Sequence, residues 1–208
     1  MTRAAARVAG APVAALALAV ALAASTCGGD DGDGTGGDAP AADASLDVAV
    51  EPVDAGVRIS WTVTNDGEGP LLVFDNLRGD EAADEPLQGA YVTGGEGGVV
   101  EVSRRLFPVP DDLEGVQDYT VTAGDLGARG RETRTDSVTV PFTYAPAAPE
   151  GGGDELPEDV DRAVFCLGVA PPGAIEGAHP LGPGRWAVPH SEENAAGQTL
   201  LCSDPFDV

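Results

Sequence analysis

The sequence predicts an all-β protein built as an antiparallel β-sandwich. Apolar side chains alternate with polar ones at Val57, Ile59, Trp61 and Val63, which is the period of a strand with one buried face. Many short candidate strands follow, divided by turns rich in Gly, Pro and Asp. No window of the sequence offers a long amphipathic helix. Short strands in this number, without helices to cover them, predict two sheets packed against each other.

The strands are expected in the following order. Leu46, Val48 and Val50 alternate before the strand at 57–63, and Val138, Val140, Phe142 and Tyr144 alternate later in the chain. The later strand is expected at a sheet edge, because Pro141 has no N–H to donate. Weaker candidates cover residues 71–75, 90–93, 99–106, 119–123, 162–170, 184–188 and 199–202. Helical turns are expected only at 80–87, where Pro86 limits the helix, and at 191–198.

The first 26 residues have the layout of an export signal. Arg3 and Arg7 form a positive start, residues 8–22 are apolar, and the small residues 23–26 form the exit. The segment is expected to be removed from the mature protein. An uncleaved membrane anchor is disfavoured, because spanning needs about 20 strongly apolar residues and this run is mostly alanine, interrupted by Gly10 and Pro12.

Residues Ala24-Ser25-Thr26-Cys27 resemble the lipobox of bacterial lipoproteins. The resemblance implies cleavage before Cys27, a diacylglyceryl group on its sulfur, and anchoring to the extracytoplasmic side of the cell membrane. The bilayer would then be contacted through the lipid of Cys27. An ordinary secretory signal cut near Ala24, which would leave Cys27 as a free or paired thiol, is the alternative reading.

The charge of the chain excludes some partners. All 11 basic residues are arginine, 35 residues are acidic, and the formal net charge is -24. Cleavage before Cys27 removes two arginines and no acidic residue, so the mature charge is -26. Such a chain repels nucleic acid and anionic headgroups. We therefore expect no nucleic-acid partner.

Residues 27–44 are expected to form a flexible tether. The stretch 28–44 has no aromatic residue and no periodicity, so it cannot bury enough surface to offset its ordering entropy. Its Asp31-Gly-Asp33-Gly-Thr35-Gly36 run superficially matches a calcium loop, but Ala42 stands where the bidentate Glu is required. The folded domain is expected to cover residues 45–208 with long loops, as one domain with an insertion.

One connection has a more specific pattern. The segment from Trp61 through Asn65-Asp-Gly67 to Val73 resembles the strand, Asn-x-Gly turn and strand of bacterial immunoglobulin-like surface domains. The resemblance implies an immunoglobulin-like fold with positive φ at the turn, and it implies nothing about ligand or activity. A plain β-hairpin explains the same residues equally well. The antibody-type arrangement of a tryptophan between two well-separated cysteine strands fails. Trp61 precedes both Cys166 and Cys202, and Trp186 lies between them in a stretch that is short and rich in Gly and Pro, with little room for the strands that should separate the two cysteines.

Cys166 and Cys202 form the natural disulfide pair in an oxidising compartment once Cys27 carries lipid. Their bond would join the C-terminal strand to its partner strand. A metal or redox pair is disfavoured, because the two residues lack CxxC spacing.

No catalytic motif is found, and no cofactor or metal is expected. His179 and His190 lie in Ala-His-Pro and Pro-His-Ser contexts, where turn or surface positions are commoner than metal ligation. The acidic clusters, at 80–85, at 111–114 and at 154–161, are expected to be solvated surface charge rather than paired catalytic carboxylates. The arginines at 104–105 and at 129, 131 and 134 are expected to pair with the chain's own carboxylates.

These observations favour a non-enzymatic, membrane-anchored lipoprotein that binds an envelope protein, a glycan or a small ligand. An envelope enzyme or metal-handling protein is the alternative. Convergence of His179, His190 and carboxylates within a few ångströms would favour that alternative.

Overall fold

The computed structural model describes residues 41–76, 90–109, 120–147 and 153–208. Across these residues the fold is all-β, as predicted, with one short α-helix, α1 (Glu192–Gly197), and two single-turn 3-10 helices, η1 (Glu96–Gly98) and η3 (Pro172–Ala174). The strands are β1 (Ala44–Val53), β2 (Gly56–Asn65), β3 (Leu71–Asn76), β4 (Tyr91–Gly94), β5 (Val100–Arg104), β6 (Thr120–Leu126), β7 (Arg131–Thr139), β8 (Arg162–Ala170), β9 (His179–Gly182), β10 (Arg185–Pro189), β11 (Thr199–Cys202) and β12 (Phe206–Asp207). They form two sheets.

The smaller sheet, sheet A, has the order β1-β2-β7 and is antiparallel throughout. Its central strand β2 shows the alternation predicted from the sequence. Val57, Ile59, Trp61 and Val63 are buried, while the residues between them are partly or fully exposed. Sheet A therefore buries one face and leaves the other to solvent.

The larger sheet, sheet B, has the order β4-β5-β8-β3-β6-β10-β9, with β11 and β12 also paired to β8. Cys166 of β8 lies between Ser103 of β5 and Cys202 of β11, and Val169 lies between Val73 of β3 and Thr199 of β11. Because a strand has only two edges, β5 and β3 must occupy successive halves of the same edge of β8, opposite β11. The sheet thus divides into two branches at β8.

One pairing departs from the antiparallel prediction. Strand β5 runs parallel to β8, from Val100 opposite Ala163 to Arg104 opposite Leu167. Parallel neighbours need a long crossover, and here the chain between them contains β6 and β7. Sheet B is therefore mixed.

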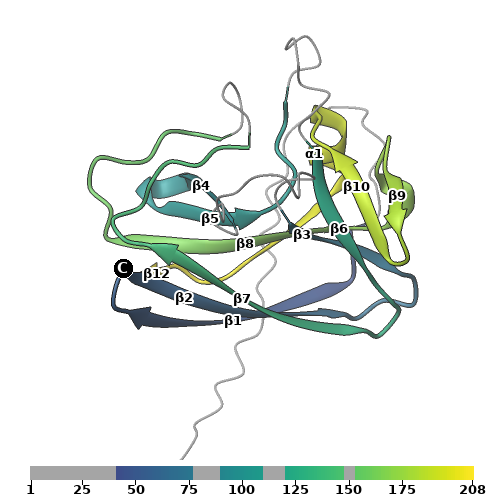
Figure 1. Cartoon of the computed structure of the whole chain (residues 1–208), viewed down its shortest axis with the longest axis horizontal. Helices are drawn as coiled ribbons and strands as arrows, with labels where there is room; N and C mark the ends of the chain where they lie inside the picture. The colour runs from purple at the N-terminus through teal and green to yellow at the C-terminus, as the bar shows by residue number, and fades with distance from the viewer. Residues whose placement is uncertain (1–40, 77–89, 110–119, 148–152) are drawn as a thin grey trace, which may run out of the picture. The chain divides into compact units, whose positions relative to one another are not determined.

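The two sheets share one hydrophobic core. In Figure 1, β1, β2 and β7 form one layer, and β8, β3 and β5 belong to the layer that faces it. The ring of Trp61 on β2 stacks on that of Phe165 on β8, with centroids 6.0 Å apart. Both side chains are completely buried. The strongest sequence signal for a strand, at 57–63, thus supplies the inner wall of sheet A.

The connection from β2 to β3 differs from the plain hairpin reading, because β2 belongs to sheet A and β3 to sheet B. The Asn-x-Gly segment is where the chain passes between the sheets. Asn65 and Gly67 do not have the positive φ expected for a hairpin turn. Instead, the buried Asn65 amide donates to the carbonyl oxygens of Gly69, Leu126 and Gly127, and its oxygen accepts the N–H of Gly67. A side chain, rather than a strained backbone, holds this connection.

The predicted strand at 138–144 is mostly wrong. Strand β7 starts at Arg131 and ends at Thr139, so Pro141 lies beyond it, although β7 is an edge strand of sheet A. The first half of β7 carries no apolar alternation, because its inward positions are the charged residues Glu132, Arg134 and Asp136. These face a polar cluster described below, which is why the hydrophobic pattern did not reveal them.

The weaker strand predictions are confirmed, with small differences in their bounds. Strands β8 and β11 have the predicted bounds, and β3, β4, β5, β6 and β10 lie within a few residues of theirs. Helix α1 falls inside the predicted 191–198 segment, with Ser191 accepting the N–H of Asn194 as its cap. The short strands β9 and β12 were not predicted. The helical turn expected at 80–87 lies outside the described residues.

Candidate functional site

Several residues singled out from the sequence lie outside the described part of the chain. These are the leader 1–26, Cys27, most of the tether, and the acidic clusters at 80–85 and 111–114. Lipidation of Cys27 therefore stays a prediction. Among the described residues, no helix is long and apolar enough to cross a membrane.

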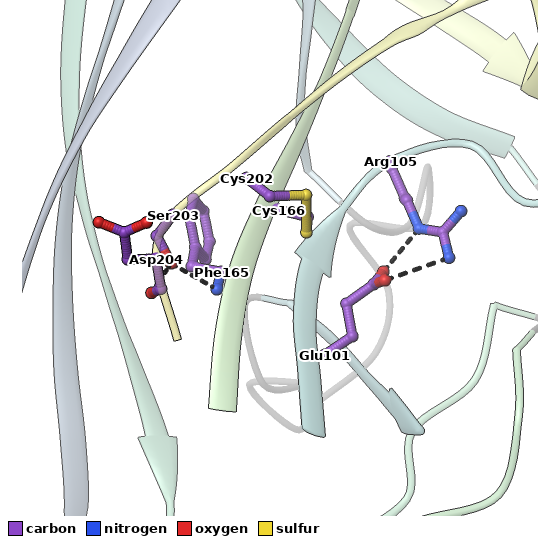
Figure 2. The surroundings of a disulfide bond; sticks show 7 residues. All are labelled: Glu101, Arg105, Phe165, Cys166, Cys202, Ser203 and Asp204. Carbon is purple, nitrogen blue, oxygen red and sulfur yellow. Dashed lines mark hydrogen bonds and ion pairs between the residues drawn. A yellow bond between two sulfur atoms is a disulfide. The ribbon is translucent and has the colours of Figure 1, made fainter. Parts of the chain in front are cut away.

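The predicted Cys166–Cys202 disulfide is present. The two residues are direct cross-strand partners on β8 and β11, with their Cα atoms 4.1 Å apart. The bond lies within sheet B, beside the ion pair of Glu101 and Arg105 on the β5 side (Figure 2). It joins the C-terminal segment to the strand on which both branches of the sheet depend.

Ser203 continues the pairing beyond the disulfide. Its N–H donates to the carbonyl oxygen of Phe165, and its hydroxyl accepts the N–H of Phe165 at 3.1 Å (Figure 2). The next short strand, β12, then pairs with Arg162 and Ala163. The C-terminus is thus bound along most of β8.

The two histidines have different environments. His179 is exposed on β9, whereas only 4% of His190 is exposed. The backbone N–H of Phe107 donates to Nδ1 of His190 at 3.0 Å, and the Tyr91 hydroxyl lies 2.9 Å from Nε2. An accepting Nδ1 places the proton of the neutral ring on Nε2, directed at Tyr91. Both ring nitrogens are used within the fold.

Burial lowers the pKa of His190 to about 4, and the positive charge of Arg105 adds to the effect. Arg105 lies over the Phe107 ring, 4.0 Å from its centroid, and pairs with Glu101. His190 is therefore neutral at physiological pH and connects three segments of the chain. Within the described residues, no group of three or more His, Cys, Asp and Glu side chains is placed to hold a metal ion.

The acidic cluster that the structure describes, and most of the arginines singled out from the sequence, behave as expected. In the cluster at 154–161 every Asp and Glu is exposed. Arg104 pairs with Asp136, Arg105 with Glu101, Arg131 with Asp47, and Arg134 with Asp75 and Glu132. The arginines are thus mostly balanced by the chain's own carboxylates.

The most distinctive cluster is an ionic network between the two sheets, in which both carboxylates are buried and Arg134 and Arg185 are partly exposed. It consists of Trp61 (β2) and Arg134 and Asp136 (β7) from sheet A, with Asp75 (β3), Arg104 (β5), Thr122 (β6) and Arg185 (β10) from sheet B. Six strands therefore meet in it. Since Arg104 ends β5 and Asp75 lies on β3, the network fills the point where the two branches separate at β8.

Asp136 forms the inner half of the network. The Trp61 indole N–H donates to Oδ2 at 2.7 Å, and the Arg104 guanidinium donates to both carboxylate oxygens, with Nε 2.9 Å from Oδ2. Arg104 also donates to the carbonyl oxygen of Asp75. The side chains of Arg104 and Asp136 are only 9% and 4% exposed. A bidentate guanidinium is the geometry that best compensates a buried carboxylate.

Asp75 forms the outer half. Its fully buried side chain accepts from Arg134 at 2.5 Å, from Arg185 at 3.3 Å and from the Thr122 hydroxyl at 3.4 Å. Burial alone would lower the pKa of Arg134, but the charges of Asp75 and Glu132 outweigh it and raise that pKa above its ordinary value. All four oxygens of Asp75 and Asp136 accept hydrogen bonds, so the network is a structural junction between the sheets.

Sequence reasoning missed this network. The signal was available in Arg131–Thr139, where Glu132, Arg134 and Asp136 alternate with Thr and Ser. Such a strand has charged side chains on one side and hydroxyl side chains on the other. If the hydroxyl side chains face solvent, the charged ones face the interior, where they need ion-pair partners. The partners on β3, β5 and β10 are too distant in sequence for any spacing to indicate them.

Comparison of the sequence with protein-family models and with curated proteins, and of the structure with solved structures, gives no significant match.

Proposed function

We propose that this protein is a lipid-anchored, extracytoplasmic lipoprotein of the bacterial cell envelope that acts as a non-enzymatic binding or structural module. Its folded part is proposed to be an immunoglobulin-like sandwich, held away from the bilayer by the part of the predicted tether 27–44 that precedes β1 at Ala44. The lipid on Cys27 would provide the membrane attachment, and the sandwich would contact an envelope partner.

The observation that carries this proposal is the Cys166–Cys202 disulfide. Disulfides persist in oxidising compartments and are rare in the cytosol. Such a compartment agrees with an export signal at 1–26 and a lipobox-like sequence ending at Cys27. The C-terminal segment holds several Gly and Pro residues between β8 and β11, so a covalent constraint there has a clear physical use.

The immunoglobulin-like assignment rests on the arrangement around Trp61. This tryptophan lies on the central strand of sheet A and packs across the core on Phe165 of sheet B. Both β2–β3 and β6–β7 connections pass between the sheets. The parallel β5–β8 pair and a disulfide within one sheet distinguish this sandwich from antibody domains.

A binding role is supported by how the polar side chains of the interior are used. The side-chain oxygens of Asp75 and Asp136 and the ring nitrogens of His190 form hydrogen bonds within the fold. Those contacts connect strands of both sheets, and a preorganised framework of this kind would lower the ordering cost of binding at its surface.

The proposal is tested by the intact non-reducing mass of the mature protein extracted from membranes of its native host, followed by reduction and thiol counting. We expect a diacylglyceryl adduct on an N-terminal Cys27 and two thiols that appear only on reduction. The matched control is Cys27→Ser, which should lose the adduct and leave the membrane fraction while keeping the disulfide. An unlipidated chain that starts at another residue would overturn the anchored-module proposal.

A further inference from the structure

The outer face of sheet A is unusually rich in hydroxyl groups. We call this surface the hydroxyl face, and it lies on the side of β1, β2 and β7 turned away from β8 (Figure 1). Its members are Ser45 on β1, Ser60, Thr62 and Thr64 on β2, and Thr133, Thr135, Ser137 and Thr139 on β7. Those on β1 and β7 are exposed and those on the central strand half-buried.

The hydroxyls stand in register across the strands. Ser60 lies opposite Thr135 with their hydroxyl oxygens 3.2 Å apart, and Thr62 lies opposite Thr133 with theirs 2.9 Å apart. Along each strand the pairs repeat every second residue, roughly 6.6 to 6.8 Å, and neighbouring strands are about 4.8 Å apart. The hydrogen bonds between them restrict the hydroxyl rotamers, so the face presents a preorganised array of donors and acceptors.

The strand positions of the hydroxyl face carry no net charge on a strongly acidic chain. They hold two acidic and two basic side chains, which pair as Arg58 with Glu51 and Arg131 with Asp47, and at the edge of the face the Ser45 hydroxyl donates to the carboxylate of Asp66. The whole chain carries a formal charge of -24. Because the charges on the strands are paired with one another, they offer little attraction to a charged partner, and an anionic one would also be repelled by the rest of the protein.

The composition of the face also argues against a protein partner. Protein interfaces are enriched in aromatic residues, Met and Arg at their centres and depleted in Ser. The centre of this face is formed by Ser60, Thr62, Thr133 and Thr135. A partner that replaces the water on such a surface must itself offer many uncharged donors and acceptors at repeated intervals, which is the chemistry of a polyol chain.

We propose that the hydroxyl face binds a neutral polysaccharide, with the chain lying along β2 and β7 and its hydroxyls meeting the Ser and Thr rows. This proposal rests on the proposed function and deepens it, because it names the partner class of the binding module. Each contact is an uncharged hydrogen bond of modest net strength, so binding depends on several of them acting along the same polymer.

The experiment measures retention of the full-length protein on immobilised neutral α-glucan, mannan and galactan, with polygalacturonate and chitosan as anionic and cationic counterparts. The test variant is Thr62→Val/Thr133→Val/Thr135→Val, which removes three hydroxyls while keeping β-branched side chains of the same shape. The control is Thr143→Val, an exposed threonine away from the face. Circular dichroism and urea unfolding verify that both variants fold.

We expect the wild-type protein to be retained on at least one neutral polysaccharide, the triple variant to lose roughly tenfold or more of that affinity, and the control to bind as the wild type does. Equal binding by the folded triple variant, retention only on a charged polymer, or no retention on any polysaccharide would overturn the proposal. None of these results would affect the lipid adduct on Cys27, so a failure here is distinguishable from a failure of the anchored-module proposal.

Discussion

The indole N–H of Trp61 donates to the carboxylate of Asp136 at 2.7 Å, and both side chains are buried between the sheets. The same carboxylate is held by Arg104 from sheet B. One aspartate therefore connects the central strand of sheet A, an edge strand of sheet A and a branch of sheet B. The packing of the two sheets depends on this charged contact as well as on the apolar core.

Removing the charge of Asp136 should be costly. Asp136→Asn leaves Arg104 as a buried cation without its partner, and breaking a buried pair in this way costs about 3 to 5 kcal/mol. Glu51→Gln, in an exposed pair with Arg58, should cost less than about 1 kcal/mol. Urea unfolding at neutral pH measures both. Equal shifts of the two midpoints would show that the buried network does not stabilise the fold.

Mild acid should destabilise the protein through His190. The pKa of His190 is about 4 in the folded state, against 6.5 ordinarily. At pH values between these two, the ring is protonated in the unfolded chain and neutral in the folded one. The free energy of unfolding should therefore fall as pH drops from about 6.5 to about 4, by roughly 3 kcal/mol. Below pH 4 this contribution is already lost.

The matched variant for this test is His190→Asn, whose side-chain oxygen can still accept the N–H of Phe107. Carboxylates titrate in both proteins, so the informative quantity is the difference between the two free energies of unfolding at each pH. That difference should be constant above pH 7 and shrink toward pH 4. A difference that stays unchanged across the range would contradict a neutral, buried His190.

The disulfide should contribute through the unfolded chain. Cys166 and Cys202 are 36 residues apart in sequence, and closing a loop of that length is worth about 4 kcal/mol in the chain-entropy model. Cys166→Ala/Cys202→Ala should lower the free energy of unfolding by about this amount. Adding a reductant should lower the stability of the wild-type protein similarly and leave the variant unchanged. If the reductant lowers the free energy of unfolding of both proteins equally, the loss of stability does not come from reduction of the Cys166–Cys202 disulfide.

Asn65 should tolerate substitution poorly. Asn65→Ala removes the amide donor to the Gly69, Leu126 and Gly127 carbonyl oxygens and the acceptor of the Gly67 N–H. The Gly67 N–H and the Gly127 carbonyl keep a backbone partner, and the expected cost is still about 2 kcal/mol or more. Asn65→Asp should be worse at neutral pH, because a carboxylate would face three carbonyl oxygens, and the excess should diminish in acid as the carboxyl group protonates. Asp66→Asn, at the next residue, is the control and should change stability by less than about 1 kcal/mol. Thermal unfolding of the three variants decides the order.

How much of this architecture could be predicted depended on what each strand buries. The alternation of Val57, Ile59, Trp61 and Val63 marked β2 because its inner face carries large apolar side chains that are buried in the core, although the Trp61 indole N–H also reaches Asp136. The same rule failed in the first half of β7, whose inner face meets the ionic network instead. The disulfide was predictable because two cysteines remained after Cys27, and that inference needs no knowledge of the fold.

Other features depend on contacts between distant segments. Nothing near Arg104 indicates that Asp136 and Asp75 will lie beside it, and nothing near His190 points to Phe107 or Tyr91. The Asn65 connection shows the same limit at short range. Its residue pattern matched a turn, while its actual role, donating to carbonyl oxygens 4, 61 and 62 residues away, is set by where β6 ends.

The position of β8 in the chain has a consequence for how the protein acquires its fold. Strands β3 and β5 both pair with β8, yet β8 begins at Arg162, long after them. A chain emerging from its N-terminus must therefore wait for most of its length before the two branches of sheet B can join. Such long-range pairing is slow and leaves strand edges open in the meantime. Assembly of this sandwich is thus a late, C-terminal event, and the emerging chain has to remain unaggregated until its last quarter arrives.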